Sequence, residues 1–465
     1  MKTLSTEFHT HTSIHFERFH EFAKTILIPP RATLRLLSRI IEPFSGENKN
    51  KYWNRLAKKI ASFFGVILCT PLAIFTAPIG KTLELVSHLF RPMISYIDNS
   101  SNIEVGPKIS PSLSREKPLQ IRTHNLGFVP NFMSNIGDLR DPEIRAKEVV
   151  ESINSDLLPP DIIFFQEAFH EDASRILFNG IKEQYPYVVH SIAPQISGFN
   201  SGAAIASKYP IENVEYIRLK GMIFPENISP RGVVISTLKT AQGPLKIYSV
   251  HTQPLPGKGR ADVRLLQLKQ IQEKMAADLK KDPNLKQVLV GDLNTSRLTA
   301  WGEDNIFPNQ QPELPVQKYL NDNFNDLYLN DHDARTGKRN NEKQPKFLLS
   351  DNRRIGVDGL AEPSGSWYVG PFNKKGFVMK IKIKIDRMLN HFAKPQKVVS
   401  TNKTVWGTPE WRALQPANTA RFDYILVPKH HNLTGEVEIR RIVPSKKAES
   451  APTDHLPVDG RIWIP

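Results

Sequence analysis

Cysteine is almost absent from this chain of 465 residues, which carries only Cys69. A single cysteine excludes an intrachain disulfide and argues strongly against a cysteine-ligated zinc site. The sequence is therefore not that of a small secreted scaffold built on disulfides. It carries no information on the redox compartment.

Acidic residues are in deficit. The chain has 47 Asp and Glu against 62 Lys and Arg, a net charge of +15 and a pI near 9.6. Such an excess of positive charge predicts an anionic partner, whether nucleic acid, a phosphorylated small molecule or an acidic membrane face. Apolar residues make up 40% of the chain, enough for a sizeable core. The length allows one large domain with additions, or two to three domains.

Charge is missing altogether from residues 60–80, and a bilayer-spanning helix needs about 20 apolar residues. The segment lies too far from Met1 for a removable signal peptide and lacks a small-residue cleavage pattern. We therefore predict an uncleaved membrane anchor that attaches the chain to a membrane. Because Pro71 and Pro78 would kink a single helix, a hairpin of two short insertions and a buried helical hairpin remain alternatives.

Three regions follow from these patterns. Residues 1–97 form a predicted helical N-terminal region that includes a basic amphipathic helix at 32–41. Residues 98–117 are rich in Ser, Pro and Asn and are typical of a linker. From residue 118 to 465, short apolar runs alternate with helical patterns, which indicates an α/β domain.

Polar side chains follow two predicted strands at the start of this domain. The strand that begins at Leu119 ends on Asn125, and the apolar run 162–165 is followed by Gln166 and Glu167. A carboxylate at the end of a buried strand is unfavourable unless it is paired or binds a cation. Mg²⁺ and similar cations take such oxygen ligands, so Asn125 and Glu167 are predicted metal ligands.

The same pattern recurs at residues 288–296. An apolar strand breaks at Gly291, and period-two geometry predicts that Asp292 and Asn294 point to the same side. The pair could hold water, a phosphate oxygen or a metal, or it could only cap a turn. Just upstream, residues 231–238 and 244–251 form a predicted antiparallel pair that ends on His251. A helix at 262–279 follows, with Val263, Leu266, Ile271 and Met275 expected to face inward.

The C-terminal part supplies the last polar residues. A predicted strand at 420–427 carries Asp423, and residues 451–458 contain the adjacent pair Asp454 and His455. Because an aspartate that accepts a hydrogen bond from a histidine sets its tautomer, Asp423 is expected to orient His455.

Residues 335–404 form a basic insertion with 16 Lys and Arg against 5 Asp and Glu. It is either a solvated face or a surface that meets a phosphate-rich partner. Trp367, Trp406 and Trp411 are candidates for a substrate or membrane rim.

Taken in order, these stretches resemble the endonuclease/exonuclease/phosphatase superfamily over residues 118–465. The resemblance implies an α/β fold, a four-layer α/β/β/α sandwich of two mixed sheets flanked by helices. It also implies Mg²⁺-dependent cleavage of phosphoester bonds, with Mn²⁺ or another divalent cation as a substitute. The motifs most similar to the neutral sphingomyelinase branch are Gln166-Glu-Ala-Phe, Ala206-Ser-Lys-Tyr-Pro-Ile, Arg231-Gly-Val, His251-Thr-Gln-Pro and Arg264-x-x-Gln267-Leu. The chain departs from that branch in its basic insertion and at Arg231, where lysine is common.

The resemblance and the residue chemistry together imply in-line attack of water on phosphorus. Glu167, helped by Asn125, would hold the metal. Asp292 would orient or deprotonate the water, and Asn294 would fix the phosphate. His251 and His455 would donate to phosphoryl oxygens, Asp423 would orient His455, and Asp454 would support the water or the metal.

The predicted function is that of a membrane-attached, sphingomyelinase-like phosphodiesterase acting on a phospholipid headgroup. The enzymatic alternative is a nuclease whose basic insertion grips the phosphate backbone of DNA or RNA. The alternative from another class is a non-catalytic membrane-binding or partner-binding module that has kept the fold.

Overall fold

A computed structural model of the chain describes residues 19, 22–41, 49–89, 93–99, 118–130, 141–193, 199–240, 243–254, 258–295, 314–330, 423–439, 453, 455 and 457–464. The basic insertion 335–404, the three tryptophans named above and most of the predicted linker lie outside the described residues.

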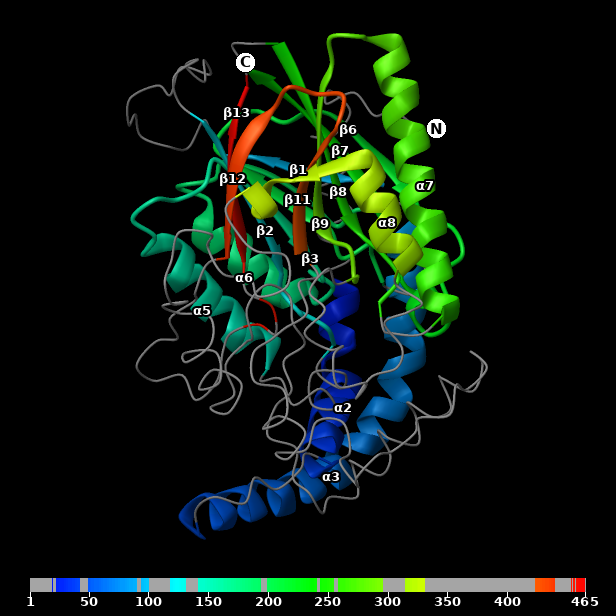
Figure 1. Ribbon diagram of the computed structural model, residues 1–465. Coiled ribbons are helices and arrows are strands. Elements are labelled where there is room, and N and C mark those ends of the chain that lie inside the picture. Colours follow the sequence, from blue (N-terminus) through cyan, green and yellow to red (C-terminus); the bar gives the residue numbers. More distant parts are fainter. Residues whose placement is uncertain are drawn as a thin grey trace, which may run out of the picture.

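Two mixed β-sheets form the centre of the structure (Figure 1). The seven-stranded sheet has the order β1 (Ser95–Asp98), β4 (Tyr187–His190), β5 (Ala204–Ser207), β3 (Ile162–Gln166), β2 (Leu119–Asn125), β13 (Val458–Trp463) and β12 (Thr434–Ile439). The six-stranded sheet has the order β10 (Phe324–Asp326), β11 (Asp423–Pro428), β9 (Lys286–Asp292), β8 (Gly243–His251), β7 (Gly232–Thr240) and β6 (Glu212–Arg218). Parallel pairing is confined to β2 with β3 and β8 with β9 among these strands.

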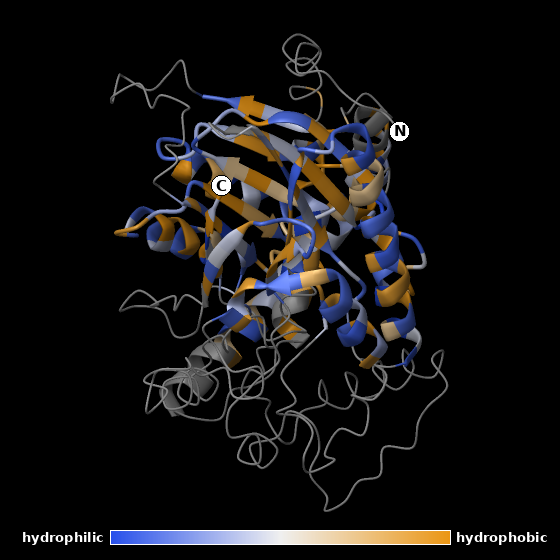
Figure 2. Cartoon of the chain, turned by 45° about the horizontal axis from the view of Figure 1, so that its top comes forward, coloured by the Kyte–Doolittle hydropathy of each residue, from blue (hydrophilic) through white to orange (hydrophobic). Residues whose placement is uncertain are grey.

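Helices cover the outer face of each sheet. The seven-stranded sheet packs against α5 (Pro142–Asn154) and α6 (Glu171–Ile181), and the six-stranded sheet packs against α7 (Lys258–Lys281) and α8 (Leu314–Asn323). Hydrophobic residues concentrate in the strands, while hydrophilic residues line the outer helices (Figure 2). The predicted four-layer α/β/β/α sandwich is thus confirmed.

The apolar strands are explained by this layering. In β3, Ile162 and Phe164 lie in the core between the sheets, whereas Ile163 and Phe165 pack beneath α5 and α6. All four side chains are fully buried, and each such burial contributes about 1.5–3 kcal/mol. Successive side chains of β3 point alternately into the two cores, so every position must be apolar. This explains why the sequence of β3 is an unbroken apolar run.

The inward face of α7 differs from the one predicted. Ile271 and Met275 are buried as expected, but Leu266 is 47% exposed. Its expected place is taken by Arg264 and Gln267, which are buried because they hydrogen-bond the loop after β8: Arg264 Nη1 donates to the carbonyl of Gln253, and Gln267 Oε1 accepts from its amide. Apolar periodicity alone could not predict this polar contact.

The N-terminal region forms a helical hairpin of α2 (Ile28–Ile41) and α3 (Lys49–Leu89). Helix α3 continues through Pro71 and Pro78, so the predicted alternative of two short insertions is wrong. Residues 56–83 are long and apolar enough to cross a membrane, and only 6% of the most apolar window is buried. The alternative of a buried helix is therefore also wrong for this segment.

Strand β1 includes residue 98, the first residue of the predicted linker. Residues 95–98 pair antiparallel with β4 at the edge of the seven-stranded sheet. The chain thus joins the sandwich before residue 118, although the predicted domain boundary at 97–98 itself stays a prediction.

Candidate active site

Three predicted residues form one row across the six-stranded sheet. Asp292 pairs with Asp423 on one side and with His251 on the other, at the ends of β9, β11 and β8. Residues in one row of a sheet project from the same face. The row therefore brings together a carboxylate pair and an imidazole that are far apart in the sequence.

The facing sheet adds two more predicted residues. Asn125 ends β2 and lies beside Gln166, which ends the parallel strand β3, and both strands contact β9. Asn125 Nδ2 donates to Asp292 Oδ2 at 3.0 Å, which ties the two sheets together at this point. Gln166 instead turns into the seven-stranded sheet, where its Oε1 accepts from Thr123 Oγ1 at 3.2 Å.

Asp292 both caps a turn and faces the candidate site, the two roles that the sequence left open. Its Oδ1 accepts from the backbone amide of Asn294 at 2.8 Å, which makes a turn, while its Oδ2 faces Asn125. Asn294 adopts a left-handed conformation with φ 48° and donates from Nδ2 to the carbonyl of Thr252 at 3.3 Å. Strand β9 ends at Asp292, so the period-two alternation used in the prediction does not extend to Asn294.

Asp423 and His455 are in contact as predicted. The distance between His455 Nδ1 and Asp423 Oδ2 is 2.8 Å, and both residues are buried. Because an ionised carboxylate only accepts, Nδ1 carries the proton in this pair. Within the described part of the chain, the other oxygen of Asp423, Oδ1, is buried without a hydrogen-bond partner.

Buried negative charge dominates the electrostatics of this corner. Ligand atoms of Asp292, Asp423 and His455 all lie within 4.8 Å of one another. Burial, and next the Asp423 carboxylate, raises the pKa of Asp292, against the opposing effect of His455 and of the hydrogen bonds from Asn294 and Asn125. A cation at this place would relieve the repulsion between the carboxylates.

Glu167 reaches the same place from the end of β3. Its backbone is left-handed with φ 55°, and its Oε1 lies 3.3 Å from Arg231 Nη2 and 3.7 Å from His251 Nε2. The carboxylate at the end of this buried strand is half-buried and paired, as the cost of burying a charge requires.

Arg231 was noted in the sequence as part of a motif and as a departure from a lysine, but it was not predicted as a site residue. In the structure its Nη1 lies 2.6 Å from His251 Nε2, and its guanidinium stacks over the Phe169 ring at 5.6 Å. Since a guanidinium only donates, Nε2 of His251 accepts and the imidazole is neutral. Burial, followed by the charges of Arg231 and His455, holds the pKa of His251 well below its usual range. In this arrangement the donor beside Glu167 is Arg231. The sequence predicted that His251 would donate to a phosphoryl oxygen, but its Nε2 accepts from Arg231 here.

Of the predicted residues, Asp454 lies outside the described part of the chain. The others converge on one place at the carboxyl ends of β2, β3, β8 and β9: Asn125, Glu167, His251, Asp292, Asn294, Asp423 and His455.

The donor set fits a hard divalent cation. Glu167, Asp292 and Asp423 offer carboxylate oxygens, and Asp423 Oδ1 lacks a partner among the described residues. The amide oxygen of Asn125 accepts from Gly127 N at 3.0 Å and keeps a second lone pair. Oxygen donors of this type suit Mg²⁺ or Mn²⁺ and not a soft metal.

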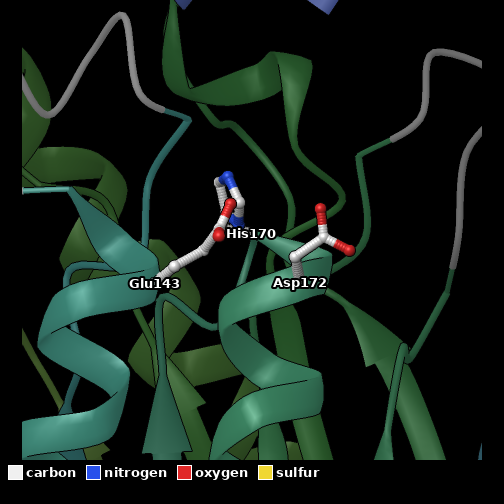
Figure 3. A group of neighbouring side chains, drawn as sticks. All are labelled: Glu143, His170 and Asp172. Carbon is white, nitrogen blue, oxygen red and sulfur yellow. The ribbon is translucent and has the colours of Figure 1, made fainter. Parts of the chain in front are cut away.

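A second cluster of metal-type side chains lies at the N-termini of α5 and α6 (Figure 3). It consists of Glu143, His170 and Asp172. Arginines engage both carboxylates, since Arg35 Nη2 lies 2.6 Å from Glu143 and Arg175 Nη2 lies 2.8 Å from Asp172. His170 Nδ1 accepts from Ala173 N and caps α6. These contacts account for the cluster as ion pairs and a helix cap.

Comparison with known proteins finds a matching family model and similar sequences. The model of the Endonuclease/Exonuclease/phosphatase family matches residues 123–455. Sphingomyelinase C of Leptospira interrogans is 27% identical over 218 residues, 42% of this chain and 38% of that protein. Sphingomyelinase C of Bacillus cereus is 28% identical over 212 residues, 41% of this chain and 60% of that protein. The chain thus spans less than two thirds of the length of these relatives.

Among solved structures, a variant of beta toxin from Staphylococcus aureus with bound magnesium ions is similar to this chain. The two are 18% identical with a TM-score of 0.43, and the similarity covers 74% of this chain and 99% of the other.

Proposed function

The chain belongs to the endonuclease/exonuclease/phosphatase family, and from this premise we propose that it is a metal-dependent phosphodiesterase that hydrolyses a phospholipid headgroup. One observation carries the proposal. The row of His251, Asp292 and Asp423 in one sheet meets Asn125 and Glu167 from the other, so the acidic and basic groups needed for phosphoester hydrolysis converge.

Metal binding falls to Glu167 and Asn125 in this proposal, with Mg²⁺ as the expected ion. When bound, such an ion neutralises charge on a phosphate oxygen and holds the phosphate for attack. Glu167 presents its carboxylate from the residue after β3, and Asn125 is held by Gly127 and Asp292. Asp454, adjacent to His455, is proposed to support the water or the metal side.

Asp292 is the proposed partner of the attacking water. Hydrogen bonds from Asn125 and Asn294 hold its two oxygens in one orientation, and the residue is buried between the sheets. A carboxylate held in this way can orient a water molecule and accept its proton. Asn294, next to this turn, is proposed to fix the phosphate.

His455 is the proposed proton donor to the phosphoryl group. Asp423 accepts from Nδ1, which fixes the orientation of the ring and stabilises the charged imidazolium. Arg231 supplies a second positive charge beside Glu167. A negative phosphoryl oxygen is stabilised by such preorganised donors. His251 would donate from Nε2 only if Arg231 released that nitrogen.

The phospholipid substrate is supported by the sphingomyelinase C relatives and by the apolar helix α3. The proposed attachment to a membrane through residues 60–80 would place the enzyme beside such a substrate. Hydrolysis of nucleic acid is the competing outcome, which the net charge of +15 alone would also allow.

The test uses the full-length protein with Mg²⁺ or EDTA and offers sphingomyelin vesicles, phosphoinositide vesicles and plasmid DNA. We expect Mg²⁺-dependent release of a lipid headgroup, and loss of this activity in Asp292→Ala and His455→Ala. Asp262→Ala, on the exposed surface of α7, is the matched control and should keep full activity. DNA nicking without headgroup release would reject the lipid substrate, and near-normal turnover in either site variant would reject the site.

A further inference from the structure

Helix α3 has two faces of different composition. Small or half-buried side chains gather on one side: Ser62, Gly65, Cys69, Ala73 and Gly80. Large apolar side chains are exposed on the other: Ile60, Phe63, Phe64, Ile67, Leu68, Leu72, Ile74, Phe75 and Ile79. At about 100° per residue, the exposed set covers roughly half of the helix circumference. Leu68 is 78% and Phe75 74% exposed, which is unusual for such residues in water.

The small face packs against α2. A Cβ at Gly65 would lie 2.8 Å from Leu36 of α2, and a Cβ at Gly80 would lie 2.7 Å from Leu27, the residue before α2. Lys59 Nζ donates to the carbonyl of Ile40 at 2.6 Å, nearer the tip of the hairpin. Helix α2 therefore runs antiparallel alongside residues 59–80, the same length of α3 that could cross a membrane.

Ion pairs join α2, and the helical residues just before it, to the catalytic sandwich. Arg35 Nη2 lies 2.6 Å from Glu143 of α5, and Lys24 Nζ lies 3.0 Å from Glu171 of α6. The acidic cluster of Figure 3 is thus the place where the basic helix α2 is attached. Glu171 follows the proposed metal ligand Glu167 by four residues, so the hairpin lies near the candidate active site.

These contacts conflict with a transmembrane orientation of α3. Arg35 neighbours Leu36, which lies level with Gly65, so a bilayer crossed by residues 56–83 would also contain Arg35 and Glu143. Charged side chains deep in a bilayer are costly, and the sandwich that carries Glu143 could not follow them. The hairpin as observed can bury its apolar face in lipid only if it lies along the membrane surface.

We propose that α2 and α3 form a monotopic anchor that lies in the plane of the membrane interface, with the large apolar face of α3 in the lipid of one leaflet. Exposed basic residues at the two ends of this segment, Lys58 and Lys81, match anionic headgroups. Resting on the proposed function, this arrangement holds the catalytic edge beside the surface of the same membrane, where lipid headgroups are presented. Figure 1 shows the hairpin on the side of the sandwich where β9 ends and β11 begins.

Depth measurements with spin labels test this orientation in the full-length protein. On a Cys69→Ser background, cysteines replace Phe64, Leu68 or Phe75 and are labelled in phosphatidylcholine vesicles with phosphatidylserine. An in-plane helix predicts a common depth of about 5–10 Å below the headgroup boundary. A helix that crosses predicts depths that change along the roughly 16 Å between residues 64 and 75. Leu157→Cys, 93% exposed on the sandwich, is the control that must report water.

Sidedness gives an independent readout. Lys58→Cys and Lys81→Cys place thiols at the two ends of the apolar segment, and both should react with a membrane-impermeant maleimide added outside sealed vesicles. Protection of one of them, or a depth profile with a maximum near residue 68, would overturn the proposal, as would a failure to bind vesicles. Neither measurement needs turnover. An in-plane anchor on a protein that cleaves only DNA would therefore reject the proposed function while leaving this inference intact.

Discussion

At the scale of single residues, the candidate site depends on hydrogen bonds that set which atom carries a proton. Asp423 decides the tautomer of His455, and Arg231 decides that of His251. Neither histidine is defined by its own sequence neighbourhood, because the partner in each case comes from a different strand. The chemistry therefore depends on pairs of residues and not on any one motif.

Replacing Asp423 by asparagine tests the first of these pairs. Asp423→Asn keeps the size of the side chain but removes the charge that supports a protonated His455. We expect kcat to fall by about 10²–10⁴-fold with little change in KM. Steady-state kinetics on sphingomyelin vesicles would measure this, with Asp262→Asn on α7 as the unaffected control. A rise in KM with unchanged kcat would assign Asp423 to substrate binding instead.

At the scale of the element, the strand β9 can deliver Asp292 only because Gly291 precedes it. Gly291 has φ 127°, and a Cβ there would lie 2.1 Å from the carbonyl oxygen of Val250 in β8. No side chain fits at this position, since both the conformation and the contact forbid one. The close approach of β8 and β9 in turn keeps His251 beside Asp292.

The glycine therefore makes a sharp stability prediction. Gly291→Ala should lower the free energy of unfolding by about 2–5 kcal/mol, from strain and from the displaced Val250 carbonyl. Gly259→Ala in α7, where a Cβ would meet nothing within 4 Å, should change it by less than about 1 kcal/mol and in the stabilising direction. Chemical denaturation in detergent compares the two. Equal effects would mean that the contact with Val250 is unimportant.

Helix α7 is attached to the sheet by a buried charge network. Lys246 and Lys274 both contact Glu215 and Asp278, and Tyr248 donates to Asp278 at 2.8 Å. Burial alone would raise the pKa of Glu215 and Asp278, but the hydrogen bonds from the lysines more than offset it and lower both.

This network predicts a loss of stability in acid. Because the folded pKa of each carboxyl is below its unfolded value of 4.5 or 3.8, the unfolded state takes up protons first as the pH falls. The stabilisation is therefore complete above about pH 5 and is lost as the pH falls through the folded pKa values. Asp278→Asn should reduce this pH dependence, and the exposed Asp262→Asn on the same helix should not. Unfolding measured from pH 7 to pH 3 would show parallel curves for all three proteins if the network were unimportant.

At the scale of the whole molecule, a metal bound between the two sheets should stabilise the sandwich. Ligand binding to the folded state adds about 2.7 kcal/mol at a concentration one hundred times Kd. We expect Mg²⁺ to raise the thermal midpoint of the full-length protein, and Glu167→Gln to abolish most of that rise. NaCl at the same ionic strength separates specific binding from screening. A Mg²⁺ response that survives in Glu167→Gln would place the ion elsewhere.

Much of the fold was predictable from local patterns. The period-two and unbroken apolar runs marked β3, β8 and β9, and the polar residues at their ends marked most of the site. The inward face of α7 was not predictable from apolar periodicity. Arg264 and Gln267 are buried because they hydrogen-bond Gln253 in the loop after β8, and the apolar pattern of the helix carries no signal of that contact. Arg231 was missed for the same reason, since its partners Glu167 and His251 come from other strands.

The sequence by itself determined which chemical groups are available and in what order, because strand and helix periodicity is a local property of the chain. It also determined that one long segment, residues 60–80, has an apolar surface to bury. The tertiary structure alone decided that Asp292 contacts Asn125 of the other sheet and that Arg231 donates a hydrogen bond to Nε2 of His251. It also decided that α2 lies along α3 with its arginine bound to Glu143. These contacts depend on strand register and layer packing between distant residues, and neither is encoded in any single stretch of the chain.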